Sequence, residues 1–257
     1  MCLNKERFDE IMSEEIVSVK NVTKVLKKRK AINSMTFQVN EGDICGFIGP
    51  NGAGKTTLIR LLTGLISPSS GTLYLNKIDV TKNREEALKN LGAIVESPIF
   101  FEYLTGEKAL LNLAMLNNDM NKEERKEKVK EVIKIVGLEG REKDKVKIYS
   151  LGMKQRLGIA QALLNNPKII ILDEPANGLD PLGMIELRKL ILKLNKENNI
   201  TFFISSHILD EIQKICNKLI IIKEGSLVWS GNTDELLSKV SETNKLEDIF
   251  VKLMTSN

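Results

Sequence analysis

The chain has 257 residues, of which 42% are hydrophobic, and this size and composition suit one large α/β domain or two small ones. Its net charge of +4 is modest, its three cysteines are too scattered for a disulfide framework, and no apolar run approaches the roughly 18 residues of a membrane helix. The polar N-terminus lacks the apolar stretch of a signal peptide, so we expect the chain to stay in the cytoplasm.

The first part of the chain predicts a β-rich region behind a polar extension. Residues 1–13 form the extension, and Met12 within it is a second possible start site. Short β-rich runs between residues 16 and 39 predict antiparallel strands. The next apolar run, residues 43–48, predicts a buried strand in which Cys45 is a small core residue.

A glycine-rich segment follows this strand and fits the pattern Gly, any four residues, Gly-Lys-Thr. This pattern is the phosphate-binding loop of nucleotide triphosphatases, in which glycines let backbone N–H groups approach a triphosphate closely. Lys55 is expected to reach the β- and γ-phosphates, Thr56 to bind Mg²⁺, and Thr57 to contact an outer phosphate. A chance glycine-rich turn is the alternative, but the predicted strand before the loop and helix after it favour the site. The candidate residues are Gly49, Pro50, Asn51, Gly52, Ala53, Gly54, Lys55, Thr56 and Thr57.

A helical block comes next. From Thr105 to Val136, apolar residues recur at helical spacing with few strand signals, which predicts a helical subdomain inserted at about residues 97–165. The segment Lys122–Lys128 alternates in charge sign, which favours a solvated helix face over a nucleic-acid-binding patch, so no nucleic-acid partner is expected.

Three uninterrupted apolar runs, at residues 169–172, 201–204 and 219–222, predict strands buried on both faces of a parallel sheet. Helical stretches separate them, as a βαβ architecture requires. The predicted fold is α/β, a P-loop NTPase core with a mixed, mainly parallel sheet, an N-terminal antiparallel β part and the inserted helical subdomain. One domain at residues 14–235 would precede a short helical tail at residues 236–257.

Four further segments contain residues that could bind a nucleotide or take part in its hydrolysis. Asp173 and Glu174 end a buried strand, at the sheet edge where such folds place their ligands, although a strand followed by a polar turn would look alike. Ser150 and Gly152 precede an apolar helix and make an anion-binding helix start, or a plain N-capped helix. The third and fourth segments contain Asp180, before a proline, and His207, the only histidine, at the end of another buried strand.

Together with the phosphate loop, these segments resemble ATP-binding subunits of ABC transporters over roughly residues 14–235. The resemblance implies that Asp173 binds Mg²⁺, directly or through water, and that Glu174 polarises the attacking water. It also implies that His207 is a switch histidine that contacts the γ-phosphate and orients this water.

The resemblance further implies a dimer that sandwiches two ATP molecules, formed by two copies of the chain or with a homologous ATPase subunit. Ser150 and Gly152 would point at the γ-phosphate that the opposite subunit holds, and Asp180 would cross the interface. Leu151 and Met153 stand where the family's signature usually has Gly and Gln.

Two departures narrow the subfamily. Glu96 stands where the family usually has a Gln that ligates Mg²⁺, and a carboxylate can still bind the metal. Glu96 and the signature segment together resemble the bacterial subgroup for bacitracin resistance and lantibiotic self-immunity. Leu26 stands where an aromatic usually stacks on adenine, and because it can cover the base only by apolar contact, ATP and GTP both remain open.

These features predict an ATPase that powers a separate membrane permease, lies at the inner face of the cell membrane through it, and exports or expels an antimicrobial peptide. The permease would dock near Glu96–Tyr103, although the aromatics there could equally be core of the helical insert. The alternative is a soluble ABC-type ATPase that acts on ribosomes or nucleic acid, and a P-loop kinase is a third option. The single domain without sustained heptads argues against the soluble machine.

Overall fold

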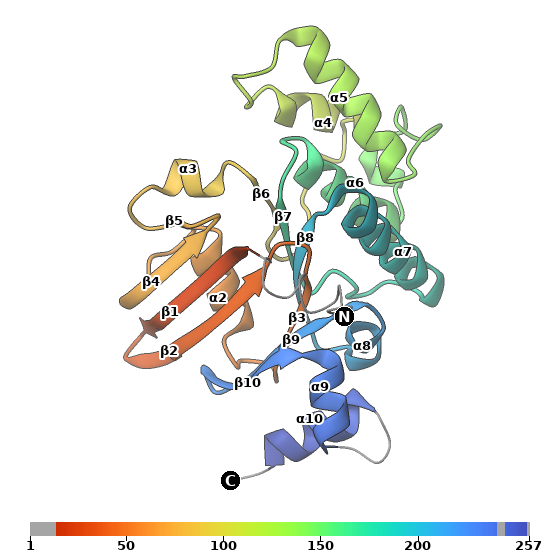
Figure 1. Cartoon of the computed structure of the whole chain (residues 1–257). Coiled ribbons are helices and arrows are strands. Elements are labelled where there is room, and N and C mark those ends of the chain that lie inside the picture. Colours follow the sequence, from red (N-terminus) through yellow and green to blue (C-terminus); the bar gives the residue numbers. More distant parts are fainter. Residues whose placement is uncertain (1–13, 241–244, 256–257) are drawn as a thin grey trace, which may run out of the picture.

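The computed structural model of the chain describes residues 14–240 and 245–255, so the polar extension at 1–13, including Met12, lies outside the described residues. The described strands form two sheets, a four-stranded one of order β2-β1-β4-β5 and a six-stranded one of order β10-β9-β3-β8-β7-β6. Figure 1 shows the two sheets side by side, with helices around the larger one.

The four-stranded sheet is the antiparallel part that the sequence predicts. β1 pairs antiparallel with both β2 and β4, and β4 pairs antiparallel with β5. The β1–β2 hairpin turns at Lys27 and Lys28, which both have positive φ, as the tight turns that match strand twist require. The strands are β1 (Glu15–Leu26), β2 (Arg29–Asn40), β4 (Ser70–Leu75) and β5 (Ile78–Asp79).

The six-stranded sheet is parallel except for β10, which pairs antiparallel with β9 at one edge. β3 lies between β8 and β9, and β7 lies next to β8, so the carboxyl ends of these strands meet at the same edge of the sheet. The strands are β3 (Ile44–Ile48), β6 (Leu91–Ile94), β7 (Ile169–Asp173), β8 (Thr201–Ser206), β9 (Lys218–Lys223) and β10 (Ser226–Asn232).

The apolar runs of this sheet are buried on both faces because successive side chains point to opposite sides of a strand. In β7, Ile169 and Ile171 join one hydrophobic cluster, whereas Ile170 and Leu172 join the other. One cluster packs the antiparallel sheet and α2 (Lys55–Leu62) onto the larger sheet, and α2 lies between the two sheets in Figure 1. The other cluster packs the helices that follow β6 in the chain onto the opposite face.

The helical block at residues 97–165 contains two helices that lie together at one end of the molecule, at the top of Figure 1, and a third that packs on both of them and on β6. The charged segment is part of α5, where the ion pairs are spaced i,i+3, as in Lys128–Glu131. The helices of the block are α4 (Gly106–Ala114), α5 (Lys122–Ile135) and α6 (Leu151–Leu163), with a 3₁₀ turn η1 (Val146–Ile148). The helices outside the block include α3 (Arg84–Leu88), α7 (Pro181–Asn198) and α8 (Leu209–Ile215).

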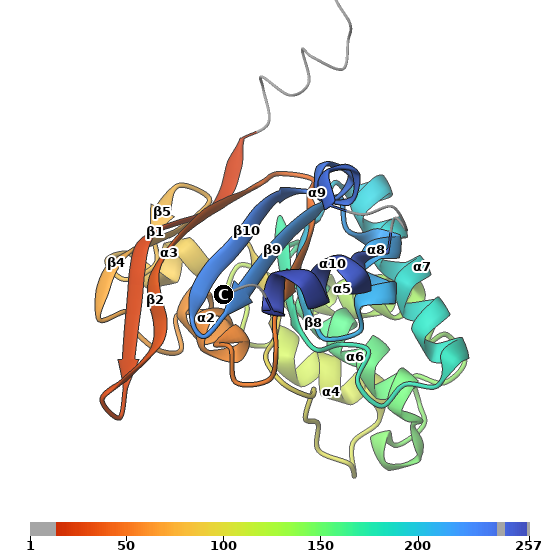
Figure 2. The ribbon, with the colours of Figure 1, turned by 90° about the horizontal axis from the view of Figure 1, so that it is seen from below.

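The C-terminal part contains two helices, α9 (Thr233–Val240) and α10 (Leu246–Thr255), where the sequence predicts a short helical tail from residue 236. Figure 2 shows them on the side of the molecule where β9, β10 and α8 lie, and α10 packs against α8 through the buried Leu246 and Ile249. Over the part of the chain that the structure describes, no helix has the length and apolar character that crossing a membrane requires.

Cys45 on β3 and Cys216 after α8 are both buried, as the sequence predicts for Cys45. Burial raises the pKa of both thiols, and the thiolate is the form that reacts with alkylating agents. We therefore expect neither cysteine to react with iodoacetamide in the native protein near neutral pH, and both to react after denaturation. Mass spectrometry of the two peptides measures this, and rapid native labelling of either would contradict the buried placement.

Candidate functional site

The phosphate loop connects β3 to α2 and is pressed against neighbouring backbone on two sides. A Cβ on Gly54, whose φ is 110°, would lie 2.5 Å from the carbonyl oxygen of Ala31. A Cβ on Gly49 would lie 2.6 Å from the carbonyl oxygen of Ile222. Both positions therefore require glycine, because any side chain would displace backbone.

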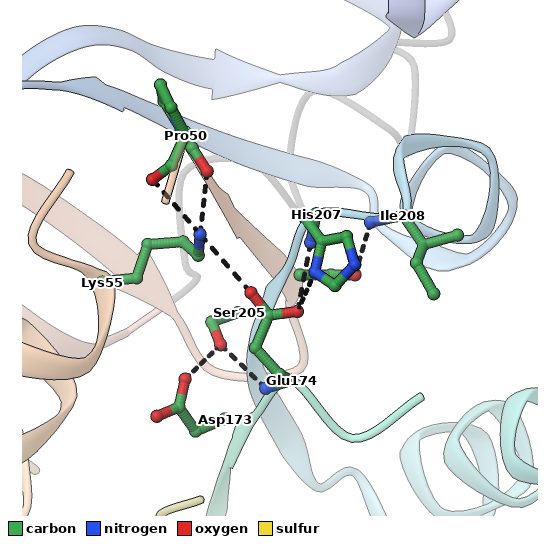
Figure 3. A network of polar contacts seen from close by, with 9 residues as sticks. Pro50, Lys55, Asp173, Glu174, Ser205, His207 and Ile208 are labelled. Atoms are coloured by element: carbon green, nitrogen blue, oxygen red, sulfur yellow. Dashed lines mark hydrogen bonds and ion pairs between the residues drawn. The ribbon is translucent and has the colours of Figure 1, made fainter. Parts of the chain in front are cut away.

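Lys55 begins α2, and its ammonium is buried at 7% exposure among oxygen atoms (Figure 3). Its Nζ donates to the carbonyl oxygens of Gly49, at 2.8 Å, and Pro50, at 3.5 Å. The same Nζ lies 3.4 Å from Oε1 of Glu174. A buried charge needs such partners, and those of Lys55 come from its own loop and from the end of β7.

The two acidic residues after the apolar run of β7 are held by Ser205 on β8. Ser205 Oγ donates to Oδ1 of Asp173 at 2.5 Å and accepts from the backbone N–H of Glu174 at 2.9 Å. Glu174 has a φ of 49°, a left-handed conformation that is uncommon for a residue with a side chain and concentrates at functional sites. Ser205 was given no role in the sequence interpretation, although its position at the end of a strand is a usable signal.

His207 contacts the same carboxylate from the opposite side. Its Nδ1 lies 2.7 Å from Oε2 of Glu174, and its backbone N–H donates to this oxygen at 3.2 Å. One oxygen of Glu174 therefore faces Lys55 while the other faces His207, as Figure 3 shows. The geometry brings together the three residues that the sequence places in different segments.

These three side chains line a pocket of about 370 Å³ at the carboxyl edge of the larger sheet. The backbone of the phosphate loop and the ammonium of Lys55 along this pocket suit a charged, phosphate-bearing ligand. Ala31 and Asn177 also line it, although the sequence interpretation assigned them no role. The lining residues are Ala31, Asn51, Gly52, Gly54, Lys55, Thr56, Thr57, Glu174, Asn177 and His207.

Ser150, Gly152 and Asp180 line a different pocket of about 370 Å³, between the starts of α6 and α7. Ser150 is the N-cap of α6 and accepts from the N–H of Met153 at 3.2 Å. Asp180 is the N-cap of α7, accepting from the N–H of Gly183 at 2.8 Å, so the N-cap expected there is present. Within one chain, Ser150, Gly152 and Asp180 therefore do not line the pocket that contains Lys55.

Leu26 and Glu96 also lie outside the lining of the pocket that contains Lys55. Leu26 ends β1 and pairs with Arg29 across the hairpin. Glu96 has a φ of 66° and forms an ion pair with Arg60, 2.5 Å away, in which both side chains are exposed. The contact of Leu26 with the nucleotide base and the contact of Glu96 with Mg²⁺ stay predictions.

The oxygen donors expected for Mg²⁺ fit that ion. Thr56 supplies a hydroxyl in the pocket lining, and Asp173 supplies a buried carboxylate, one oxygen of which accepts from Ser205. Over residues 14–240 and 245–255, no group of three or more His, Cys, Asp or Glu could hold a metal ion. Mg²⁺ does not need one, because it is usually bound by one or two carboxylates, water and substrate phosphates.

Known proteins match this chain over most of its length. The family model for ABC transporters matches residues 32–177. The bacitracin transport ATP-binding protein BcrA of Bacillus licheniformis is 47% identical over 221 residues, covering 86% of this chain and 71% of that protein. The lantibiotic transport ATP-binding protein SrtF of Streptococcus pyogenes is 35% identical over 235 residues, covering 91% and 96%.

A solved structure of a dimeric protein is also similar to this chain. The dimeric, post-hydrolysis state of the ATP-binding cassette MJ0796, bound to ADP and Pi, matches with a TM-score of 0.75 at 28% identity, covering 84% of this chain and 98% of that one. The chain belongs to the ATP-binding subunits of ABC transporters. It is an ATPase with the α/β P-loop NTPase fold, so the fold and family predicted from the sequence are confirmed. The same similarities do not favour the alternative, a soluble ATPase acting on ribosomes or nucleic acid.

Ser205→Ala tests how far the buried hydroxyl holds the end of β7. We expect it to lower the free energy of unfolding by about 2 kcal/mol, because a buried carboxylate and a backbone N–H both lose a partner. Ser206→Ala is the matched control, since Ser206 is also buried but its Oγ accepts only from the N–H of Ile208, a contact of about 1 kcal/mol. Urea unfolding measures both variants, and equal losses would contradict the special role of Ser205.

Proposed function

We propose that this subunit hydrolyses ATP to power a separate membrane permease that exports or expels an antimicrobial peptide of the bacitracin or lantibiotic type. The observation that carries the hydrolysis site is the carboxylate of Glu174, set between Lys55 and His207 at the phosphate loop. The peptide class is supported by 47% identity to a bacitracin transport ATP-binding protein and 35% identity to a lantibiotic transport one.

The loop and Lys55 bind the triphosphate. Backbone N–H groups of the loop and the start of α2 face the phosphates, and Lys55 exchanges its carbonyl partners for phosphate oxygens. Thr56 and Asp173 would hold Mg²⁺, with Glu96 as a further candidate ligand, and the metal would neutralise charge on the phosphates.

Glu174 acts as the group that polarises the attacking water and accepts its proton. Its Oε2 is fixed by two contacts from His207, one from the ring and one from the backbone N–H, so the carboxylate has a defined direction. His207 orients the water together with Glu174 and contacts the γ-phosphate through the exposed part of its ring.

A second copy, or a homologous ATPase subunit, completes the site. Ser150, Gly152 and Asp180 line a separate pocket, so within one chain they cannot act on the nucleotide that Lys55 binds. In a dimer the helix start at Ser150 would face the γ-phosphate of the opposite subunit, and its positive dipole end would attract that charge. The dimeric cassette with ADP and Pi supports this arrangement.

The permease docks on a surface made of the apolar Ile99 and the rings of Phe101 and Tyr103, here called the aromatic patch. This docking puts the subunit at the inner face of the membrane. These side chains are 92%, 67% and 68% exposed, and the rings of Phe101 and Tyr103 lie 5.5 Å apart. Their exposure favours an interaction surface over a role in the core of the helical insert.

Glu174→Gln tests the hydrolysis site. We expect ATP turnover without any acceptor to fall by at least about a hundredfold, because the water loses its base. ATP-stabilised dimers should remain detectable by light scattering, since the phosphate-binding groups are intact. Glu197→Gln, an exposed change on α7, is the control and should hydrolyse ATP at the parental rate. Full hydrolysis by Glu174→Gln would sink the assignment of the catalytic carboxylate.

The double change Phe101→Ala and Tyr103→Ala tests the aromatic patch. We expect the parent to recover a membrane permease from solubilised membranes and the double variant to recover several-fold less, while its own ATPase rate stays unchanged. Val251→Ala, an exposed apolar change on α10, is the matched control. Recovery of only ribosomes or nucleic acid by the parent would overturn the transport role.

A further inference from the structure

The helix that follows His207 is tied to its neighbour by an ion pair that the proposed mechanism does not use. Nη1 of Arg188, on α7, lies 3.3 Å from both carboxylate oxygens of Glu211, on α8. The two side chains are only 22% and 17% exposed, so solvent screens the pair less than a surface pair. One guanidinium nitrogen is shared between both oxygens of the carboxylate, so the contact is an ion pair that joins the two helices.

This ion pair lies close to the residues that follow Glu174 in the chain. Arg188 and Glu211 line a small cavity of about 30 Å³ together with Pro175 and Ala176, the residues that follow Glu174. Because a cavity remains at this junction, apolar packing alone does not fix the distance between α7 and α8. The ion pair is a polar contact between the two helices beside that packing.

Hydrogen bonds in the first turn of α8 connect the part of the helix that carries Glu211 to the segment of His207. The N–H of Ile208 donates to Ser206 Oγ at 3.0 Å, and the N–H of Ile212 donates to the carbonyl oxygen of Ile208 at 3.3 Å. These bonds join the end of β8 to the helix that carries Glu211, and His207 lies between them in the chain.

We propose that Arg188 is a positioning residue for ATP hydrolysis: by holding Glu211, it keeps His207 in contact with Glu174. This inference rests on the roles proposed above for His207 and Glu174. Arg188 does not line the nucleotide pocket, so its proposed effect runs through α8 and not through contact with the nucleotide. Lys214 also contacts Glu211, at 3.1 Å, so removing Arg188 leaves the carboxylate with a cation and the chain can still fold.

The kinetic test compares Arg188→Met, Glu211→Gln and Arg188→Lys. We expect the first two to lower kcat about ten- to a hundredfold, the range for a displaced catalytic group, while KM for ATP changes less than about twofold. Arg188→Lys keeps a cation on α7 opposite Glu211 but has a shorter reach and a different shape, so it should recover part of kcat. Lys193→Met, which breaks an exposed pair with Glu197 on the same helix, is the matched control and should behave as the parent.

A spectroscopic test reports on His207 itself, because it is the only histidine of the chain. In protein purified without a histidine tag, the imidazole gives one Cε1–H resonance in NMR spectra. We expect this resonance to shift in Arg188→Met toward its position in Glu174→Gln, and to stay unchanged in Lys193→Met. A merely structural role for Arg188 would lower the melting temperature without moving the resonance.

The outcomes separate the two proposals. If Glu174→Gln abolishes hydrolysis but Arg188→Met and Glu211→Gln keep parental kcat or an unmoved resonance, the positioning role is wrong and the hydrolysis site stands. If Glu174→Gln hydrolyses ATP normally, the proposed site itself fails. Should Arg188→Met not fold, Glu211→Gln removes the negative charge of the same ion pair from the other helix, and its kcat and resonance test the proposal.

Discussion

The site depends on one buried hydroxyl. Ser205 joins the ends of two neighbouring parallel strands, since it donates to the carboxylate of Asp173 and accepts from the backbone N–H of Glu174. Asp173 and Ser205 are also register partners, so this contact exists only in the observed pairing of β7 with β8. A slip of one residue would turn each side chain of the strand to the opposite face and separate these groups.

With the strand ends fixed, the left-handed turn at Glu174 becomes possible. A non-glycine residue in this conformation costs of order 1–3 kcal/mol, and the surrounding contacts must hold it there. Lys55 and His207 hold the side chain, while Ser205 holds the backbone. The strain and the three contacts together give the carboxylate a single direction, which is what a group that orients water requires.

The sequence predicts those parts of the fold and site whose signals are local. The phosphate loop, the two acids after an apolar strand and the N-cap at Asp180 each follow from a few consecutive residues, and the structure contains all three elements. Ala31 and Arg188 could not be found in this way, because they reach the site or its surroundings only through the arrangement of distant elements. For Leu26 and Glu96, position in a motif suggests a role, but the motif does not determine what the side chain contacts. The side chain of Glu96 forms an ion pair with Arg60, and Leu26 lies at the hairpin between β1 and β2.

The place of β3 in the larger sheet has a consequence for how the protein is made. β3 is synthesised early, yet both of its neighbours, β8 and β9, come from the last part of the chain. The antiparallel sheet can pair soon after β5 has left the ribosome, whereas contacts between distant segments form late and slowly. The phosphate loop is therefore among the first functional segments translated and among the last to gain its surroundings, and a nascent chain acquires its nucleotide site only near the end of synthesis.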